Sequence, residues 1–293
     1  SHRTLSRAWE LGVTHLDTSN AYGDGVSEEA IGAFLKAHPH RFSIATKVGI
    51  TRRPDHPFDN APDYMRTNLE ASLRRLGVDH VDLYYVHRRE QSRPVEDVME
   101  TMLRFKEEGK IGAIGLSEIS PATLDRASAV HHVAAVQSEY SLWTRLPELG
   151  LLQSCARRGT ALVAFSPLGR GLFTDRVPDP AQLGEKDFRR NNPRFAEPNY
   201  SFNRAYAARF ASYARDHGWT PAALAVAWTL HRGDHIIPIP GTRSAEHLAE
   251  WARASEISLT ATHLAEIEAI LPLGFAHGDR YNEIQNRGPE RYC

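Results

Sequence analysis

The sequence predicts an α/β fold of the (β/α)8 TIM barrel type, formed by a single domain over residues 1–293. Short strands and amphipathic helices alternate along the chain with short connections, which is typical of a parallel sheet covered by helices. The strand segments are continuous apolar runs, as expected where both faces of a sheet are buried. No Gly-x-Gly-x-x-Gly follows any strand, which disfavours the open sheet of a Rossmann fold.

Seven segments are expected to be strands: Thr14–Thr18, Phe42–Lys47, Val81–Val86, Ile111–Leu116, Val133–Gln137, Ala161–Phe165 and His235–Ile239. A (β/α)8 barrel needs eight strands. Because the chain opens on a helix over about residues 3–11, we expect the first barrel strand to be absent from this sequence. An open sheet is the alternative.

The helices are expected between these strands, and several have recognisable ends. Glycine follows four of them, at positions 12, 77, 109 and 159. Ser27-Glu28-Glu29 and Asp63 are expected to cap two others, and Pro121 begins a third. A proline-rich loop over residues 167–200 is long enough to predict a functional role. The helices are expected over residues 27–36, 63–76, 95–108, 121–130, 147–158, 202–217, 221–231, 245–253 and 260–271.

The composition is that of an ordinary globular protein, with 41% hydrophobic and 24% charged residues and a formal net charge of −1. A net charge this close to zero creates no overall electrostatic field that would attract a nucleic acid or a membrane surface. No signal peptide or membrane span is recognised. Cys155 and Cys293 form neither a disulfide framework nor a metal-ligand spacing. We therefore expect a reduced, cytoplasmic protein that binds neither nucleic acid nor a membrane and carries no metal.

Three of the predicted strands end in groups that carry protons. Asp17, Lys47 and His87 lie at or next to the carboxyl ends of their strands, and Tyr22 follows on the loop after Asp17. An α/β barrel places its chemistry at the carboxyl ends of its strands. The four side chains together can protonate an oxygen that becomes negatively charged.

Three stretches carry a resemblance to a known family. They are Gly12-x4-Asp17-Thr18-x3-Tyr22-Gly23, then Leu69-x3-Leu73-x2-Leu76-x2-Asp79-x2-Asp82-Leu83-x3-His87, and finally Ile239-Pro240-Gly241-Thr242-Arg243. The chain resembles the aldo-keto reductases over nearly its whole length, and its details are similar to the bacterial and potassium-channel-β-like branches. The resemblance implies a barrel that binds NADPH across its top and reduces aldehydes or ketones to alcohols, with NADH as the alternative cofactor.

The same resemblance implies the roles of individual residues. Tyr22 is the proton donor, and Asp17, Lys47 and His87 are its catalytic partners. Ser117 and Gln137 would hold the nicotinamide carboxamide, and Phe165 would stack on the ring. The remaining cofactor contacts would be Ser166, Leu168, Gly169, Arg170, Gly171, Gly241, Thr242, Arg243, His247 and Glu250. Trp143 and Tyr281 are expected to line an open, aromatic substrate cleft.

Some positions depart from the family pattern. Gly241 and His247 stand where the family often has Lys and Arg, so Arg243 would be the main cation for a 2′-phosphate. Two other functions stay open from the residues. One is a cofactor-binding regulatory subunit with little turnover, which the channel-β resemblance permits. The other is a metal-dependent hydrolase using His15 and Asp17, which point the same way on one strand.

Overall fold

The computed structural model describes residues 2–38 and 42–292. The chain divides into two compact units. The first unit consists of Ser1–Ser138, Gly150–Leu162 and Gly288–Cys293, and the second of Glu139–Leu149 and Val163–Arg287. A single domain over residues 1–293 stays a prediction.

All seven predicted strands are present, each with bounds within two residues of the expected ones. They follow one another in one sheet in the order β1-β2-β5-β6-β7-β8-β9. The pairs β1–β2, β2–β5, β5–β6 and β6–β7 are parallel. Their bounds are β1 His15–Asp17, β2 Ser43–Val48, β5 Val81–Val86, β6 Ile111–Ser117, β7 Ala135–Glu139, β8 Ala161–Phe165 and β9 Ile236–Ile239.

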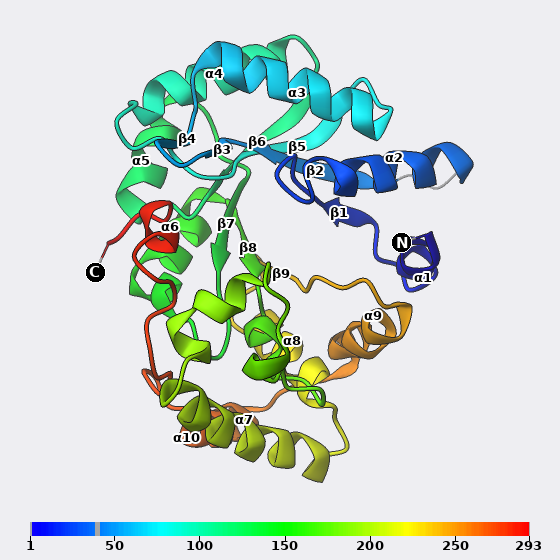
Figure 1. The fold of residues 1–293 in the computed structure, drawn as a ribbon, viewed down its shortest axis with the longest axis vertical. Coiled ribbons are helices and arrows are strands. Elements are labelled where there is room, and N and C mark those ends of the chain that lie inside the picture. Colours follow the sequence, from blue (N-terminus) through cyan, green and yellow to red (C-terminus); the bar gives the residue numbers. More distant parts are fainter. Residues whose placement is uncertain (1, 39–41, 293) are drawn as a thin grey trace. The chain divides into compact units, whose positions relative to one another are not determined.

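Among its described residues, the first unit contains six α-helices, which run from blue to green in Figure 1. Helix α3 contacts β2, and α4 contacts β6. The face of α3 that carries Met65, Leu69 and Leu73 is buried, as its apolar spacing predicts. The six are α1 His2–Glu10, α2 Val26–Ala37, α3 Pro62–Leu76, α4 Val95–Glu107, α5 Pro121–Val130 and α6 Leu151–Arg158.

Two predicted helix caps are wrong. Helix α2 begins after Gly25, whose φ of 89° suits glycine, and the Ser27 hydroxyl instead accepts a hydrogen bond from Thr18. Helix α3 begins at Pro62, so Asp63 lies in the first turn rather than at the cap. Proline needs no partner at the first helical position because it has no N–H.

Two further elements differ from the expectation. The segment between β2 and α3 forms an antiparallel hairpin, β3 Ile50–Arg53 and β4 His56–Phe58, where an irregular loop was expected. The helix predicted over residues 147–158 is interrupted at Gly150, whose φ is 130°. A short 3-10 turn, η1 Leu146–Leu149, precedes the break and α6 follows it.

The second unit contains four α-helices: α7 Asn199–Asp216, α8 Pro221–Leu230, α9 Ala245–Ala252 and α10 Ala261–Ile270. Helix α8 is apolar on all sides and contacts β9, α7 and α9. The proline-rich loop contains only short 3-10 turns, at Gly169–Gly171, Pro180–Gln182, Phe188–Asn191 and Pro193–Phe195. Among the described residues, no helix combines the length and apolarity needed to cross a membrane.

Candidate active site

The centre of the site is a buried ion pair in the first unit. Asp17 is the last residue of β1, and Lys47 is next to last on the adjacent strand β2. The Lys47 ammonium donates to an Asp17 carboxylate oxygen and, at 2.9 Å, to the carbonyl oxygen of Thr18. Lys47 is fully buried, and the Asp17 side chain is 10% exposed. The ammonium keeps one N–H without a partner among the described residues.

The second oxygen of Asp17 has a partner of its own. The side-chain amide of Gln137, on β7, donates to it at 2.8 Å. Both carboxylate oxygens are therefore held, and they hold the ammonium in one position. Charge-assisted hydrogen bonds of this kind are stronger than those between neutral groups.

Tyr22 lies next to this pair on the loop after β1. The Lys47 nitrogen is 5.1 Å from the centroid of the Tyr22 ring, within the range of a cation–π contact. Tyr22 is 42% exposed, and no described residue hydrogen-bonds its hydroxyl. The phenol is thus placed beside a buried cation with its hydroxyl available to a ligand.

His87 completes the group from the third adjacent strand. It follows β5, its backbone N–H donates to Val48 at 2.7 Å, and its ring meets that of Tyr22 edge-to-face with centroids 5.6 Å apart. Burial lowers the pKa of His87 well below its usual value, and the charges of Arg88 and Lys47 lower it further. His87 is therefore neutral at pH 7, with one ring nitrogen donating and the other accepting.

The structure thus brings together all four residues predicted as catalytic, within one unit. It also identifies a neighbour that the sequence did not single out. Tyr85 lies beside Lys47 in the sheet register, with its ring centroid 5.8 Å from the ammonium. A Cβ at Gly115 would come within 2.4 Å of that ring, so this strand position needs glycine. The only feature of the sequence that could have indicated the position of Tyr85 is Gly115, a glycine inside a predicted strand.

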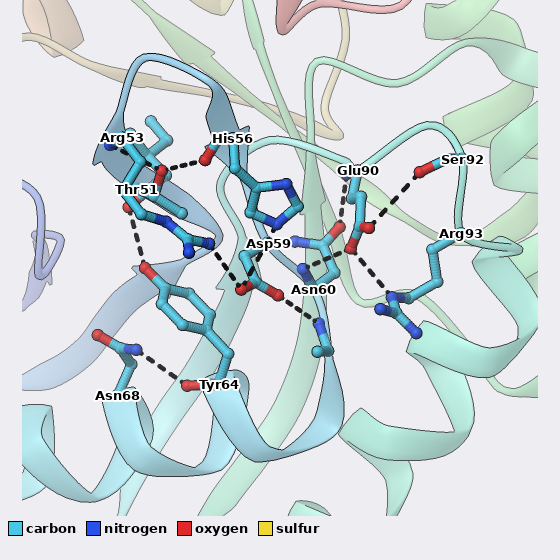
Figure 2. Close-up of polar contacts among 12 residues, drawn as sticks. Thr51, Arg53, His56, Asp59, Asn60, Tyr64, Asn68, Glu90, Ser92 and Arg93 are labelled. Carbon is cyan, nitrogen blue, oxygen red and sulfur yellow. Dashed lines mark hydrogen bonds and ion pairs between the residues drawn. The ribbon is translucent and has the colours of Figure 1, made fainter.

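A second polar network lies directly after Lys47 and His87, and Figure 2 shows it. Asn60 is fully buried; its side chain donates to the Arg88 carbonyl at 3.2 Å and accepts from the Glu90 N–H at 2.8 Å. The Glu90 carboxylate accepts in return from the Asn60 N–H at 3.0 Å and from Arg93 at 3.0 Å. This reciprocal pair ties the β3–β4 hairpin to the segment after His87.

The last residues of the first unit fasten beside β6. Glu290 accepts from Arg89 and, at 2.8 Å, from the backbone N–H of Ser120. Its own N–H donates to the Glu118 carbonyl at 2.8 Å. Burial opposes the ionised form of Glu290, but hydrogen bonds from Thr123, Ser120 and Arg89 and the Arg89 charge outweigh it and lower the pKa. No local pattern in the sequence predicts these contacts, because the partners are about 170 to 200 positions apart.

Ser117 and Gln137, which the resemblance assigns to the nicotinamide, are both buried in the first unit. The Ser117 hydroxyl accepts from Arg88 at 3.2 Å and keeps its own proton to donate. Gln137 uses its amide N–H on Asp17, which leaves its carbonyl oxygen as an acceptor. One donor and one acceptor suit a carboxamide.

In the second unit, the predicted cofactor contacts Ser166 and Leu168–Gly171 follow β8 directly. Phe165 ends that strand and is partly exposed, and the chain then turns through left-handed backbone at Ser166, Gly169, Arg170 and Gly171. Leu168 is buried. The Arg170 side chain points away from solvent, because it donates to the buried carboxylate of Glu139 at 2.7 Å.

The predicted 2′-phosphate region of the second unit has a different character. Gly241 and Arg243 are exposed, while Thr242 is partly buried and accepts from the Ser244 N–H at 2.9 Å. Ser244 caps α9 by accepting from the His247 N–H. Glu250 is partly buried on α9. These residues share one short helix and the turn before it.

The two predicted substrate-pocket residues also lie in the second unit. Trp143 is buried, packs edge-to-face against Phe173 and Phe195, and lies under the guanidinium of Arg194. The Tyr281 ring lies 4.7 Å from the Arg170 guanidinium. Trp143 is thus a packing residue of its unit here, and the open aromatic cleft stays a prediction.

The metal-site alternative depended on His15 and Asp17. His15 lies 3.2 Å from the Ser43 hydroxyl through its Nδ1, and both oxygens of Asp17 are occupied by Lys47 and Gln137. Burial is the main cause that lowers the pKa of His15. Within residues 2–38 and 42–292, no three His, Cys, Asp or Glu side chains are grouped to hold a metal ion.

Comparisons with known proteins identify the family of the chain. The model of the "Aldo/keto reductase family" matches residues 1–272. The probable aldo-keto reductase 1 of Glycine max is 39% identical over 285 residues, covering 94% of this chain and 81% of its own. The Schizosaccharomyces pombe aldo-keto reductase yakc [NADP(+)] is also 39% identical over 285 residues, covering 94% and 84%.

Among solved structures, the chain is similar to the glycerol dehydrogenase AKR11B4 from Gluconobacter oxydans. The TM-score is 0.85 at 28% identity, with 96% of this chain and 87% of the other covered. The predicted fold class, an α/β barrel of the TIM type, is confirmed by this likeness and by the parallel sheet. From the family match, the relatives and the fold, we conclude that the chain belongs to the aldo/keto reductase family, a family of oxidoreductases.

Proposed function

We propose that the protein reduces aldehydes or ketones to alcohols with NADPH, and that Tyr22 donates the proton. One observation carries the proposal. Tyr22 presents a hydroxyl with no partner among the described residues, beside a buried ammonium that Asp17 and Gln137 hold in place. Tyr22 is the single tyrosine that this chemistry requires.

The cofactor, when bound, supplies a hydride to the carbonyl carbon of the substrate. The carbonyl oxygen then becomes negatively charged, and the Tyr22 hydroxyl protonates it to give the alcohol. The phenolate that remains is stabilised by the Lys47 charge over its ring. General acid catalysis of this kind contributes typically about 10²–10⁴ in rate.

His87 acts on the same oxygen as a neutral hydrogen-bond donor. Its depressed pKa keeps the ring uncharged at pH 7, and its edge-to-face contact with Tyr22 keeps the two rings together. A neutral donor orients the carbonyl without competing with Tyr22 for the role of acid. Asp17 keeps the ammonium beside Tyr22 through all steps.

Each unit, taken by itself, offers groups that suit part of a nicotinamide cofactor. The spare Ser117 hydroxyl proton and the Gln137 carbonyl oxygen match the two sides of a carboxamide. Phe165 provides a partly exposed ring at the end of β8, and Arg243 provides an exposed cation for a 2′-phosphate. The S. pombe relative is named for NADP(+), which favours NADPH over NADH here. The other predicted contacts in the loop after β8 and on α9 are proposed with the same cofactor.

The test compares the wild-type protein with Tyr22→Phe. NADPH binding is measured by titration, and cofactor oxidation is then followed by stopped-flow absorbance with 4-nitrobenzaldehyde and a panel of other aldehydes. We expect equal NADPH affinity for both proteins, turnover by the wild type, and a loss of about 10²–10⁴ in the variant.

Two outcomes would contradict the proposal. Binding of NADPH without oxidation by any aldehyde would favour a cofactor-binding regulatory subunit. Equal turnover by Tyr22→Phe would remove Tyr22 from the chemistry. A cytoplasmic location stays a prediction from the sequence.

A further inference from the structure

The proposed chemistry needs a proton on one particular nitrogen of His87. A neutral imidazole carries one proton, on Nδ1 or on Nε2, and the hydrogen bond made by one nitrogen decides the state of the other. His87 Nδ1 lies 3.1 Å from the Ser19 hydroxyl, and both residues are buried. No described residue hydrogen-bonds Nε2.

We propose that Ser19 is a positioning residue that donates its hydroxyl proton to Nδ1 of His87 and so keeps the imidazole proton on Nε2, facing the substrate carbonyl. The inference rests on the proposed function for the identity of the carbonyl. The position of the proton on the His87 ring does not depend on the proposed function, because it can be measured on the protein without substrate.

The surroundings of Ser19 decide which way its proton points. The Ser19 oxygen accepts from the Ala21 N–H at 3.2 Å, which occupies one lone pair. Two acceptors are then in reach of its proton: His87 Nδ1 at 3.1 Å and Asn20 Oδ1 at 3.4 Å. Hydroxyl hydrogen bonds to oxygen are ordinarily 2.5–3.0 Å long, so the contact to Asn20 is a poor one.

Asn20 has a fixed orientation that supports this assignment. Its amide nitrogen donates to Asn68 Oδ1 at 2.9 Å, and the Asn68 amide donates in turn to the Tyr64 carbonyl at 2.9 Å, as Figure 2 shows for the second of these bonds. Asn20 is partly exposed, whereas His87 is buried and its Nδ1 has only Ser19 as a partner among the described residues.

The charges around His87 are consistent with a neutral ring, which the proposal requires. Lys47 and Arg88 both lower the pKa of the ring, and no carboxylate contributes to that pKa. The ring is therefore neutral, and an accepting Nδ1 gives the Ser19 proton the better of its two acceptors. The opposite tautomer would leave the Ser19 proton with only its 3.4 Å contact to Asn20.

The experiment reads the tautomer directly. Protein labelled with ¹⁵N-histidine is examined by long-range ¹H–¹⁵N correlation spectroscopy at pH 7, without substrate, and His87 is assigned by its absence in His87→Gln. We expect the wild-type ring to carry its proton on Nε2. A proton on Nδ1 would overturn the proposal without touching the proposed function.

Ser19→Ala and Ser43→Ala form a matched pair. Ser43 makes the same contact to another histidine of the first unit, with its hydroxyl 3.2 Å from His15 Nδ1. In Ser19→Ala we expect Nδ1-protonated His87 to appear and kcat to fall about two- to tenfold, as loss of one neutral hydrogen bond predicts. Ser43→Ala should change neither.

Two results separate the explanations. An unchanged His87 spectrum in folded Ser19→Ala would show that Ser19 does not set the tautomer. A wild-type spectrum with Nε2–H but no turnover by any aldehyde would leave this inference intact and defeat the proposed function.

Discussion

Each unit of the molecule contains a buried ion pair near the carboxyl end of a strand, Lys47–Asp17 in the first and Arg170–Glu139 in the second, and these two pairs have different roles. In the first unit, Lys47 pairs with Asp17 after β1 and β2. In the second unit, Arg170 pairs with Glu139 at the end of β7. All four side chains are largely or fully withdrawn from water. Burying such charges is costly, so each pair needs a reason to persist.

The surroundings of the two pairs show the difference. Beside Lys47 lies an exposed tyrosine whose hydroxyl has no partner among the described residues. Around Glu139, two more groups close the environment: Arg280 at 3.3 Å and Thr144 at 3.2 Å. Arg194, which donates to Thr144, is so enclosed that burial lowers its pKa to about 10.

The two pairs differ in a way that distinguishes a catalytic ion pair from a structural one. A structural pair satisfies its neighbours and orders loops, here the residues around Arg170 and Tyr281. A functional pair leaves a reactive group next to it exposed and unsatisfied. Burial and charge alone do not distinguish the two.

The largest expected effects come from breaking each pair. Lys47→Met and Glu139→Gln each leave charge buried without its partner, so each should lower the free energy of unfolding by about 3–5 kcal/mol in urea titrations. Only Lys47→Met should also lower kcat, by about 10² or more. A folded Glu139→Gln that lost turnover to the same extent would remove the distinction.

A smaller effect is expected from the neutral hydrogen bond that each carboxylate accepts. Gln137→Leu removes the amide from Asp17, and Thr144→Val removes the hydroxyl from Glu139. Each should cost about 1.5–3 kcal/mol of unfolding free energy, since the acceptor is charged. Aldehyde reduction should slow about tenfold in Gln137→Leu and stay near wild type in Thr144→Val. The reverse ranking of the two turnover numbers would contradict the comparison.

Two buried asparagines allow the same contrast without a charge. In the first unit, the Asn60 side chain donates to the Arg88 carbonyl and accepts from a backbone N–H. In the second unit, the Asn192 side chain donates to the Arg280 carbonyl at 2.6 Å and accepts from the Arg194 N–H. Asn60→Asp and Asn192→Asp each lose the donor and should cost about 1–3 kcal/mol in thermal or urea unfolding.

Only Asn60→Asp should alter the chemistry, because Asn60 ties the hairpin to the segment after His87. We expect a raised KM for aldehydes with a smaller change in kcat, read from steady-state kinetics at saturating NADPH. Unchanged kinetic constants in a folded Asn60→Asp would show that the hairpin is not part of the substrate site.

The smallest effect is a pH dependence confined to the first unit. The folded state keeps His87 neutral because its pKa is depressed, whereas the unfolded chain takes up a proton below about pH 6.5. Stability should therefore fall as the pH drops below 6.5, by up to about 1.4 kcal/mol per pH unit for this residue. Arg194 in the second unit titrates at about pH 10, outside this window.

Urea titrations at pH 7.0 and 5.5 measure that slope. His87→Gln should flatten it, and His15→Asn should flatten it separately, because the pKa of His15 is also lowered by burial. An unchanged slope in His87→Gln would mean that His87 is not held neutral.

The sequence by itself determined the order of strands and helices. The seven strands are short apolar runs, and the helix ends at Gly77 and Gly159 both lie in left-handed backbone, as their glycines predict. Patterns of this kind act within a few residues, so they can be read locally. The same holds for Asp17, Lys47 and His87, since the end of a predicted strand fixes where a parallel sheet presents a side chain.

Only the tertiary structure decided the partners of those side chains. The β3–β4 hairpin was missed because its charged and proline residues carry no apolar alternation, and Tyr64 and Asn60 hold it from outside. The Ser19–His87, Gln137–Asp17 and Glu290–Arg89 contacts join residues 68, 120 and 201 positions apart. Hydrogen bonds across such separations form only when the sheet brings strand ends together, so no local pattern records them.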